Sequence, residues 1–172
     1  MSVVVLDVET SGFVGVPKSS VLEVGAVCLS DDGYELSQFS SLVRPTNPFG
    51  KWSEGAMRVH QLPQDRLMRA PEPQTAWAAM LWWMSLHPPV TQVLAYNVTF
   101  DQAMMCKTFD GPEHLPWGPC IMRAASERLL GHRKGMKLEE AAGQLGVPCP
   151  EGDRHRALFD AVLAGRVWAA LL

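Results

Sequence analysis

Two carboxylates close the first apolar run of the chain. Asp7 and Glu9 follow residues 3–6 in the stretch VVVLDVETSGF, and residues i and i+2 of a strand face the same side, about 6.6 Å apart. Carboxylates on one face repel each other unless a cation lies between them. Because Mg²⁺ prefers oxygen ligands, the pair suits a metal site. The alternative is a strand that emerges into solvent and carries two surface acids.

Two later acids stand in comparable places. Asp101 follows the apolar segment TQVLAY and Asn97, inside the first turn of the next expected helix. An acid there also favours the helix dipole, which is its ordinary structural explanation. Asp160 belongs to a helix expected over residues 156–172, among largely apolar neighbours. An acid in such surroundings requires a compensating partner, and a bound cation is one such partner.

His155 precedes Asp160 by five residues. On one helix this separation would turn the two side chains roughly 140° away from each other. His155 can therefore share a site with Asp160 only from the loop before the helix, and Gly152 with Asp153 favours such a loop. Imidazole exchanges protons near neutral pH, so His155 is a candidate general base. A capping or solvated histidine is the alternative.

Three motifs, in this order and at these separations, resemble the DEDDh family of 3′-to-5′ exonucleases. They are DVET from residue 7, NVTFD from residue 97 and HRALFDA from residue 155. LEVGAV, LVRP and AMRVHQL resemble further segments of that family, and the likeness is greatest to its exodeoxyribonuclease X group. The resemblance covers nearly the whole chain. It implies a ribonuclease-H-like α/β fold, a mixed five-stranded sheet flanked by helices, in one exonuclease domain over residues 1–172.

The resemblance also implies the catalytic set. Asp7, Glu9 and Asp160 would hold a first divalent ion, Asp7 would bridge to a second, and Asp101 would support that second ion. The expected cofactors are two divalent metal ions, Mg²⁺ or Mn²⁺, which accept all-oxygen ligation. His155 would take the proton from the attacking water. Together these five side chains are the expected catalytic residues.

Contacts to the 3′-terminal nucleotide are implied in the same way. The expected substrate-binding residues are Thr10, Gly12, Val59, His60, Asn97 and Phe100. For Phe13 and Phe100 the alternatives are contact with the nucleotide and packing in the core. Gln61 stands where the family motif commonly has glycine, which leaves the turn after His60 open.

Basic residues near the site have two interpretations. The run His132-Arg133-Lys134 with Lys137 either guides the phosphate backbone toward the metals or is a solvated loop between helices. Arg154 and Arg156, which flank His155, are candidates for the same guiding role. The sequence does not decide between these alternatives.

The elements that must position these residues follow from hydrophobic patterning. We expect a three-stranded meander, then a helix, a fourth strand and four further helices. The expected strands cover residues 3–8, 21–29, 34–43 and 91–96. The five expected helices of this order cover residues 75–86, 98–108, 121–130, 138–145 and 156–172, and an additional short helix is expected over residues 53–60. The fifth strand is expected near residues 117–121, and residues 62–73 are expected to form a connection without a helix.

Composition narrows the class of protein. The chain has 172 residues, 47% of them hydrophobic, which suits a single globular domain. Its net charge of −3 provides no general basic field for a polyanion. No apolar run approaches the ~20 residues of a membrane span, and four cysteines without a CxxC pair do not favour a zinc site. We expect a cytoplasmic protein without membrane contact.

The expected function is release of nucleoside 5′-monophosphates from the 3′ end of DNA, with single-stranded ends preferred. The expected partner is therefore single-stranded DNA, with RNA as the alternative, and the chain would act as a monomer or homodimer. Two rival functions are a 3′-to-5′ exoribonuclease of the oligoribonuclease or RNase T kind and an inactive nucleic-acid-binding module.

Overall fold

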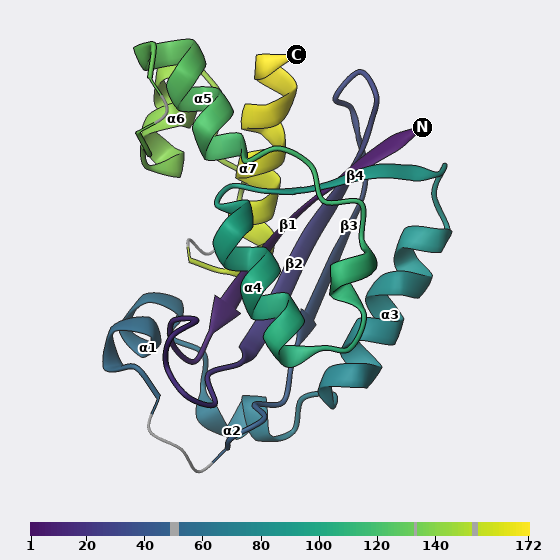
Figure 1. Ribbon diagram of the computed structural model, residues 1–172, viewed down its shortest axis with the longest axis vertical. Helices are drawn as coiled ribbons and strands as arrows, with labels where there is room; N and C mark the ends of the chain where they lie inside the picture. Colours follow the sequence, from purple (N-terminus) through teal and green to yellow (C-terminus); the bar gives the residue numbers. More distant parts are fainter. Residues whose placement is uncertain (49–51, 133, 153–154) are drawn as a thin grey trace.

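The computed structural model describes the chain except for residues 49–51, 133 and 153–154. The described residues form a four-stranded mixed sheet with helices on both faces (Figure 1). The strands are β1 (Ser2–Thr10), β2 (Val21–Ser30), β3 (Glu35–Leu42) and β4 (Val90–Ala95). The helices are α1 (Glu54–His60), α2 (Gln64–Met68), α3 (Pro73–Ser85), α4 (Val98–Thr108), the short 3₁₀ helix η1 (Pro112–His114), α5 (Ile121–Leu130), α6 (Leu138–Gln144) and α7 (Ala157–Leu171). Among them, no helix is long and apolar enough to cross a membrane.

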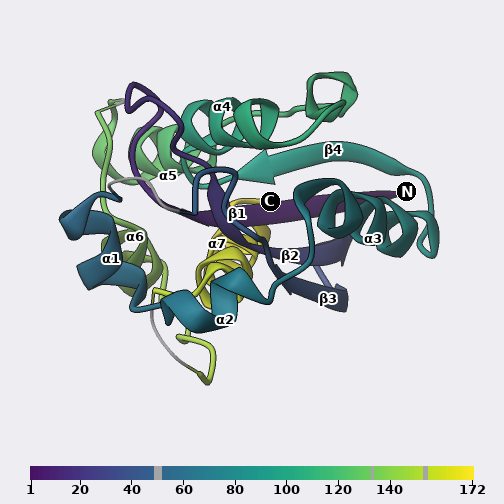
Figure 2. The same ribbon diagram turned by 90° about the horizontal axis from the view of Figure 1, so that it is seen from below.

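The strands lie in the order β3-β2-β1-β4. β1, β2 and β3 form an antiparallel meander, and β4 pairs with β1 in parallel. The meander predicted from the sequence is therefore confirmed. Figure 2 shows the sheet with α7 on one side and α3 on the other.

Side-chain alternation along β1 divides the core between the two faces of the sheet. Val4, Leu6 and Val8 pack with residues of α3 and α4, whereas Val5 packs with residues of α5, α6 and α7. Because alternate residues of a strand point to opposite faces, Asp7 and Glu9 continue the face of Val5. The two acids therefore share one face, as the spacing predicted, and this face is the one that α7 covers.

The predicted fifth strand is the one part of the fold class that is wrong. Near the predicted position, Trp117 forms only an isolated parallel bridge with Val93. Two backbone hydrogen bonds flank this bridge, from Val93 N–H to Pro116 O (2.9 Å) and from Gly118 N–H to Val93 O (2.9 Å). Prolines at 116 and 119 cannot donate to a ladder, so pairing stops after one residue.

The connection after α1 contains an unpredicted helix. α2 covers five residues of the segment that the sequence analysis treated as an open connection. Pro63 precedes its first turn with an extended backbone, and Asp65 lies within that turn, where its charge favours the helix dipole. α1 begins as predicted, because the Ser53 hydroxyl accepts a hydrogen bond from Ala56 N–H (3.4 Å).

Candidate active site

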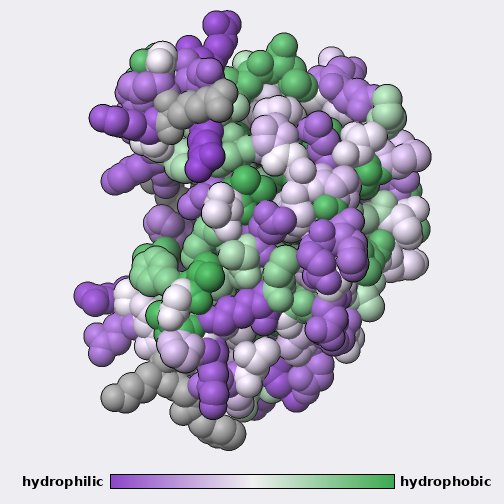
Figure 3. Space-filling model, viewed as in Figure 1, coloured by the Kyte–Doolittle hydropathy of each residue, from purple (hydrophilic) through white to green (hydrophobic). Residues whose placement is uncertain are grey.

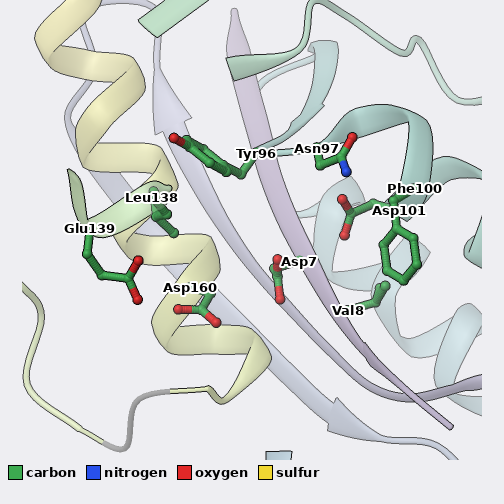
Figure 4. A pocket seen from close by; sticks show the side chains of 9 residues that line it. All are labelled: Asp7, Val8, Tyr96, Asn97, Phe100, Asp101, Leu138, Glu139 and Asp160. Atoms are coloured by element: carbon green, nitrogen blue, oxygen red, sulfur yellow. The ribbon is translucent and has the colours of Figure 1, made fainter. Parts of the chain in front are cut away.

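A glycine on β2 allows the start of α7 to touch the sheet. A Cβ at Gly25 would lie 2.1 Å from the backbone nitrogen of Leu158, so no other residue fits without moving the helix. Gly25 is paired with Asp7 across β1 and β2. α7 is therefore held against the sheet beside Asp7, and Asp160, within the first turn of α7, points into the same space (Figure 4).

A buried ion pair fixes the first residues of α7. Glu23 is 1% exposed and lies opposite Glu9 in the strand pairing. Its carboxylate accepts hydrogen bonds from Arg156 Nε (2.9 Å), Arg156 Nη2 (2.5 Å) and Ala157 N–H (3.2 Å). A forked contact of this kind is among the stronger hydrogen-bonded pairs, and it also caps the helix.

The pair changes the interpretation of the flanking arginines. Arg156 was a candidate guide for the phosphate backbone; its guanidinium is paired with Glu23 and its side chain is 33% exposed. Contact of Arg156 with a phosphate stays a prediction. Arg154 lies outside the described residues.

Four acids meet at the carboxyl end of β1. One oxygen each from Asp7, Glu9 and Asp160 can be chosen so that all three lie within 4.8 Å of one another. Asp101 joins Asp7 and Asp160 in lining a cavity of about 240 Å³, which we call the acidic pocket. Figure 4 shows Asp7 between Asp160 on α7 and Asp101 on α4. The structure thus brings together the four carboxylates that the motifs singled out.

A fifth carboxylate was not anticipated. Glu139, in the first turn of α6, also lines the acidic pocket, and its charge raises the pKa of Asp160. In the sequence it is indistinguishable from an ordinary acid at a helix start. Only the packing of α6 beside α7 places it near the site.

Burial raises the pKa of every acid in the quartet, and repulsion by the other acids raises the pKa of Asp7 and Glu9 further. The pKa of Asp7 lies well above its usual value, because of burial and then the charges of Asp101 and Asp160. Burial raises the pKa of Glu9 to about 8, that of Asp101 to about 7 and that of Asp160 to about 6. A hydrogen bond from the backbone of Val8 opposes the rise at Asp101.

These properties fit divalent cations. The donor set consists of clustered carboxylate oxygens, which Mg²⁺ and Mn²⁺ prefer. The raised pKa values mean that the acids, without a cation, resist ionisation together. A bound cation would remove that penalty.

His155 lies on the loop before α7, as its spacing from Asp160 required. It precedes Arg156, the residue that caps the helix, and its side chain is exposed. Its φ of 59° is in the left-handed region, which non-glycine residues seldom adopt. The charge of His155 lowers the pKa of Asp160, so the imidazole acts on the acidic pocket. Asp153, predicted to be part of this loop, lies outside the described residues.

A second cavity adjoins the acids. It has a volume of about 220 Å³, and we call it the apolar pocket; it is lined by Val8, Glu9, Thr10, Gly12, Phe13, Gly55, Ala56, Val59 and Phe100. Four of the predicted substrate-binding residues therefore share one cavity. Phe13 is 70% exposed, so the core-packing alternative for this side chain is wrong. Phe100 and Val8 line both pockets, so the two cavities are adjacent.

The other two predicted substrate-binding residues lie elsewhere. Asn97 lines the acidic pocket. His60 lines neither cavity: it is 3% exposed, and its Nδ1 accepts a hydrogen bond from Leu62 N–H (3.0 Å). Burial lowers the pKa of His60. Gln61 adopts the left-handed conformation (φ 51°) that ends α1, which explains why related motifs favour glycine there.

The described residues of the basic run line neither pocket. Among its described members, Lys134 is exposed and its N–H donates to His132 Nδ1 (3.2 Å). Lys137 occupies the N-cap position of α6 without a side-chain capping hydrogen bond. Arg133 lies outside the described residues, and contact with substrate remains a prediction for the whole run.

The molecular surface is hollowed near the start of α7. In Figure 3, viewed as in Figure 1, the outline recedes between the part formed by α5 and α6 and the part formed by α1. The start of α7 lies between these parts in Figure 1.

Comparison with known proteins identifies the family. The sequence model of the RNase T exonuclease family matches residues 4–167, so the chain belongs to this family of exonucleases. No curated protein matches the chain in sequence.

Solved structures agree with that assignment at the level of the fold. The nuclease domain of 3′hExo, a DEDDh family member bound to rAMP, is 19% identical with a TM-score of 0.73, over 98% of this chain and 90% of that one. E. coli exonuclease I in complex with a dT13 oligonucleotide is 17% identical with a TM-score of 0.72, over 99% of this chain. The chain spans 40% of that exonuclease I chain. The fold is therefore that of the DEDDh 3′–5′ exonucleases, with four strands in the described sheet.

Proposed function

We propose that the chain is a single-domain, metal-dependent 3′–5′ exodeoxyribonuclease that releases nucleoside 5′-monophosphates, with single-stranded ends preferred. The observation that carries the proposal is the position of the acidic pocket beside an apolar pocket, with Phe100 lining both. A phosphodiester at the acids and a base in the apolar pocket are adjacent parts of one terminal nucleotide.

The acids would hold the two divalent ions that DEDDh exonucleases use. Asp7, Glu9 and Asp160 form the closest group of oxygens and suit one ion. Asp101, from the other side of Asp7, suits the second. When bound, such ions activate water and neutralise charge on the phosphoryl oxygens.

His155 is the proposed general base. Its exposed position on the loop before α7 leaves the imidazole accessible to water and substrate. The Glu23–Arg156 pair fixes the residue that follows it. The imidazole would accept the proton of the attacking water, a role that typically contributes roughly 10²–10⁴-fold to the rate.

The apolar pocket is the proposed seat of the 3′-terminal base. Phe13, Val59 and Phe100 offer apolar surfaces for a base, and aromatic stacking tolerates any base identity. Thr10 and Gly12 would contact the sugar. The Thr10 hydroxyl donates to Gly12 O (3.0 Å), so these two residues are already fixed relative to each other.

The choice of DNA rests on the likeness of the motifs to the exodeoxyribonuclease X group. Similar folds occur in exonuclease I in complex with dA16 and dT13 oligonucleotides and also in a 3′-exonuclease that recognises the histone mRNA stem-loop. An exoribonuclease is therefore the second candidate. Against the inactive-module alternative stand the five side chains, all present in the sequence.

One panel of substrates tests the proposal. Matched single- and double-stranded DNA and RNA, labelled at the 5′ end, are incubated with Mg²⁺, Mn²⁺ or chelator, and Asp7→Asn is the matched inactive variant. We expect stepwise shortening of single-stranded DNA with either metal, and none with chelator or Asp7→Asn. Faster shortening of RNA would select the exoribonuclease, and no turnover of any substrate would favour the inactive module.

Two remaining parts of the proposal concern the surroundings of the chain. We propose a cytoplasmic location and a monomeric or homodimeric state. Light scattering of the purified chain and fractionation of the native cells test these two points separately.

A further inference from the structure

The loop that follows β1 forms one wall of the apolar pocket. Residues 11–20, called here the pocket loop, contribute Gly12 and Phe13 to the cavity. The middle of the loop gains little from hydrophobic burial, because Phe13 is 70% and Val14 is 41% exposed. Figure 1 shows the loop in dark purple, between α1 and the end of α4. Polar contacts must therefore hold it in place.

Lys107 provides three such contacts from the last turn of α4. Its Nζ donates hydrogen bonds to Val14 O (3.0 Å), Val16 O (2.6 Å) and Ser19 Oγ (2.7 Å). An ammonium group has three N–H donors, and all three find acceptors in the pocket loop. The side chain thus closes a contact between segments about 90 positions apart in the sequence.

Neighbouring groups extend this contact into a small network. Ser19 Oγ lies 2.8 Å from Phe13 O and 2.9 Å from Val16 O, so its one hydroxyl proton has an acceptor within the loop. Thr108, the next residue of α4, accepts a hydrogen bond from Val21 N–H (2.9 Å), where the loop enters β2. The end of α4 therefore holds both the middle of the loop and its exit.

The other end of α4 carries residues of the site. Phe100 lines both pockets and Asp101 is one of the clustered acids. A helix is a stiff element, and the eleven residues of α4 span about 16 Å. Fixing the loop to one end of α4 consequently fixes the distance between its Phe13 and the Phe100 wall at the other end.

We propose that Lys107 is a positioning residue for the terminal nucleotide. Its ammonium holds the pocket loop so that Gly12 and Phe13 stay opposite Phe100, which presets the width of the apolar pocket before substrate arrives. The expected effect of Lys107 on nucleotide affinity rests on the proposed function. The hydrogen bonds of Lys107 to the pocket loop do not depend on it. Because its three donors are occupied, Lys107 acts on the loop rather than on a phosphate.

Three variants test the inference. Lys107→Met keeps the length of the side chain and removes its donors, and Lys107→Arg restores a cation with several donors. Lys18→Met is the control, because it removes a charge of the same kind from an exposed side chain of the pocket loop itself. If Lys107→Met does not fold, Ser19→Ala replaces it, since this change removes one of the three acceptors.

The first measurement is amide hydrogen exchange across residues 13–19, which needs no substrate. Lys107→Met should accelerate exchange there roughly tenfold or more, whereas Lys107→Arg should retain most of the protection and Lys18→Met all of it. Unchanged exchange in Lys107→Met would overturn the inference.

The second measurement is steady-state cleavage of 5′-labelled single-stranded DNA with Mg²⁺. Lys107→Met should raise KM roughly 5–20-fold with kcat changed less than about twofold, the pattern of lost binding without lost chemistry. The ratio of KM values should persist in high salt, because a direct contact to phosphate would be screened. An equal rise in Lys18→Met, or loss of the effect in salt, would contradict the role. If even the wild-type chain cleaves nothing, the proposed function fails, and the exchange data alone still decide whether Lys107 holds the loop.

Discussion

Neutralising one acid should stabilise the metal-free protein. Glu9 shares its surroundings with Asp160 and Glu23, and burial with these charges raises its pKa from 4.5 to about 8. A carboxyl group whose pKa is higher in the folded state binds its proton more tightly there. The stabilisation that this tighter proton binding gives the folded state is therefore complete below pH 4.5 and is lost as the pH rises through 8. Glu9→Gln removes this loss, because the amide does not ionise.

The size of the effect follows from the shift. One pKa unit corresponds to about 1.4 kcal/mol, so the full rise at Glu9 corresponds to about 4–5 kcal/mol. Glu9 is partly exposed, and solvent screening reduces the value to about 2–3 kcal/mol. For a chain of this length, such a gain raises the Tm by roughly 5–10 °C.

Thermal unfolding in chelator, at about pH 4.5 and at about pH 8, measures this gain. Glu9→Gln should match the wild-type protein at the lower pH and exceed it at the higher pH. The exposed Glu151→Gln is the control and should match the wild-type protein at both. With Mg²⁺ at the higher pH, the wild-type protein should gain more stability than Glu9→Gln. A Glu9→Gln variant that is less stable than the wild-type protein at the higher pH in chelator would refute the proposed repulsion.

Three further changes give separate outcomes. His155→Ala should lower kcat roughly 10²–10⁴-fold while Mg²⁺ still raises the Tm; loss of the Mg²⁺ effect would make His155 a ligand instead of a base. Glu23→Leu leaves the Arg156 guanidinium half-buried without its carboxylate, and urea unfolding should show a loss of roughly 3–5 kcal/mol; a neutral result would mean that the pair does not anchor α7. Phe13→Ala should raise KM for single-stranded DNA while its stability stays within about 0.5 kcal/mol of the wild-type value, and an unchanged KM would remove Phe13 from the nucleotide site.

The sequence predicted the parts of the site that depend on local spacing. Asp7 and Glu9 share a face because strand side chains alternate. The five-residue spacing from Asp160 likewise predicted that His155 lies on the loop before the helix, because on the helix it would point away from Asp160. Hydrophobic patterning also predicted the four strands, whereas the fifth strand, implied by the family resemblance, is reduced to a single bridge by the prolines beside Trp117.

Contacts between distant segments could not be predicted in this way. Glu23 looked like one acid in an apolar strand, yet it binds Arg156 more than a hundred residues later. Lys107 and Glu139 looked like ordinary charged residues near helix ends, and their roles arise from how α4 and α6 pack. Such partners depend on tertiary geometry, which no local pattern encodes.

The identity of the released product tests the central claim most directly. Single-stranded DNA is digested with Mg²⁺ in water enriched in heavy oxygen, and the products of the wild-type chain and of Asp160→Asn are analysed by mass spectrometry. The wild-type chain should release nucleoside 5′-monophosphates one at a time from the 3′ end, each with one heavy oxygen on phosphorus, and Asp160→Asn should release none. Nucleoside 3′-monophosphates, internal fragments, or equal release by Asp160→Asn would contradict the proposed active site.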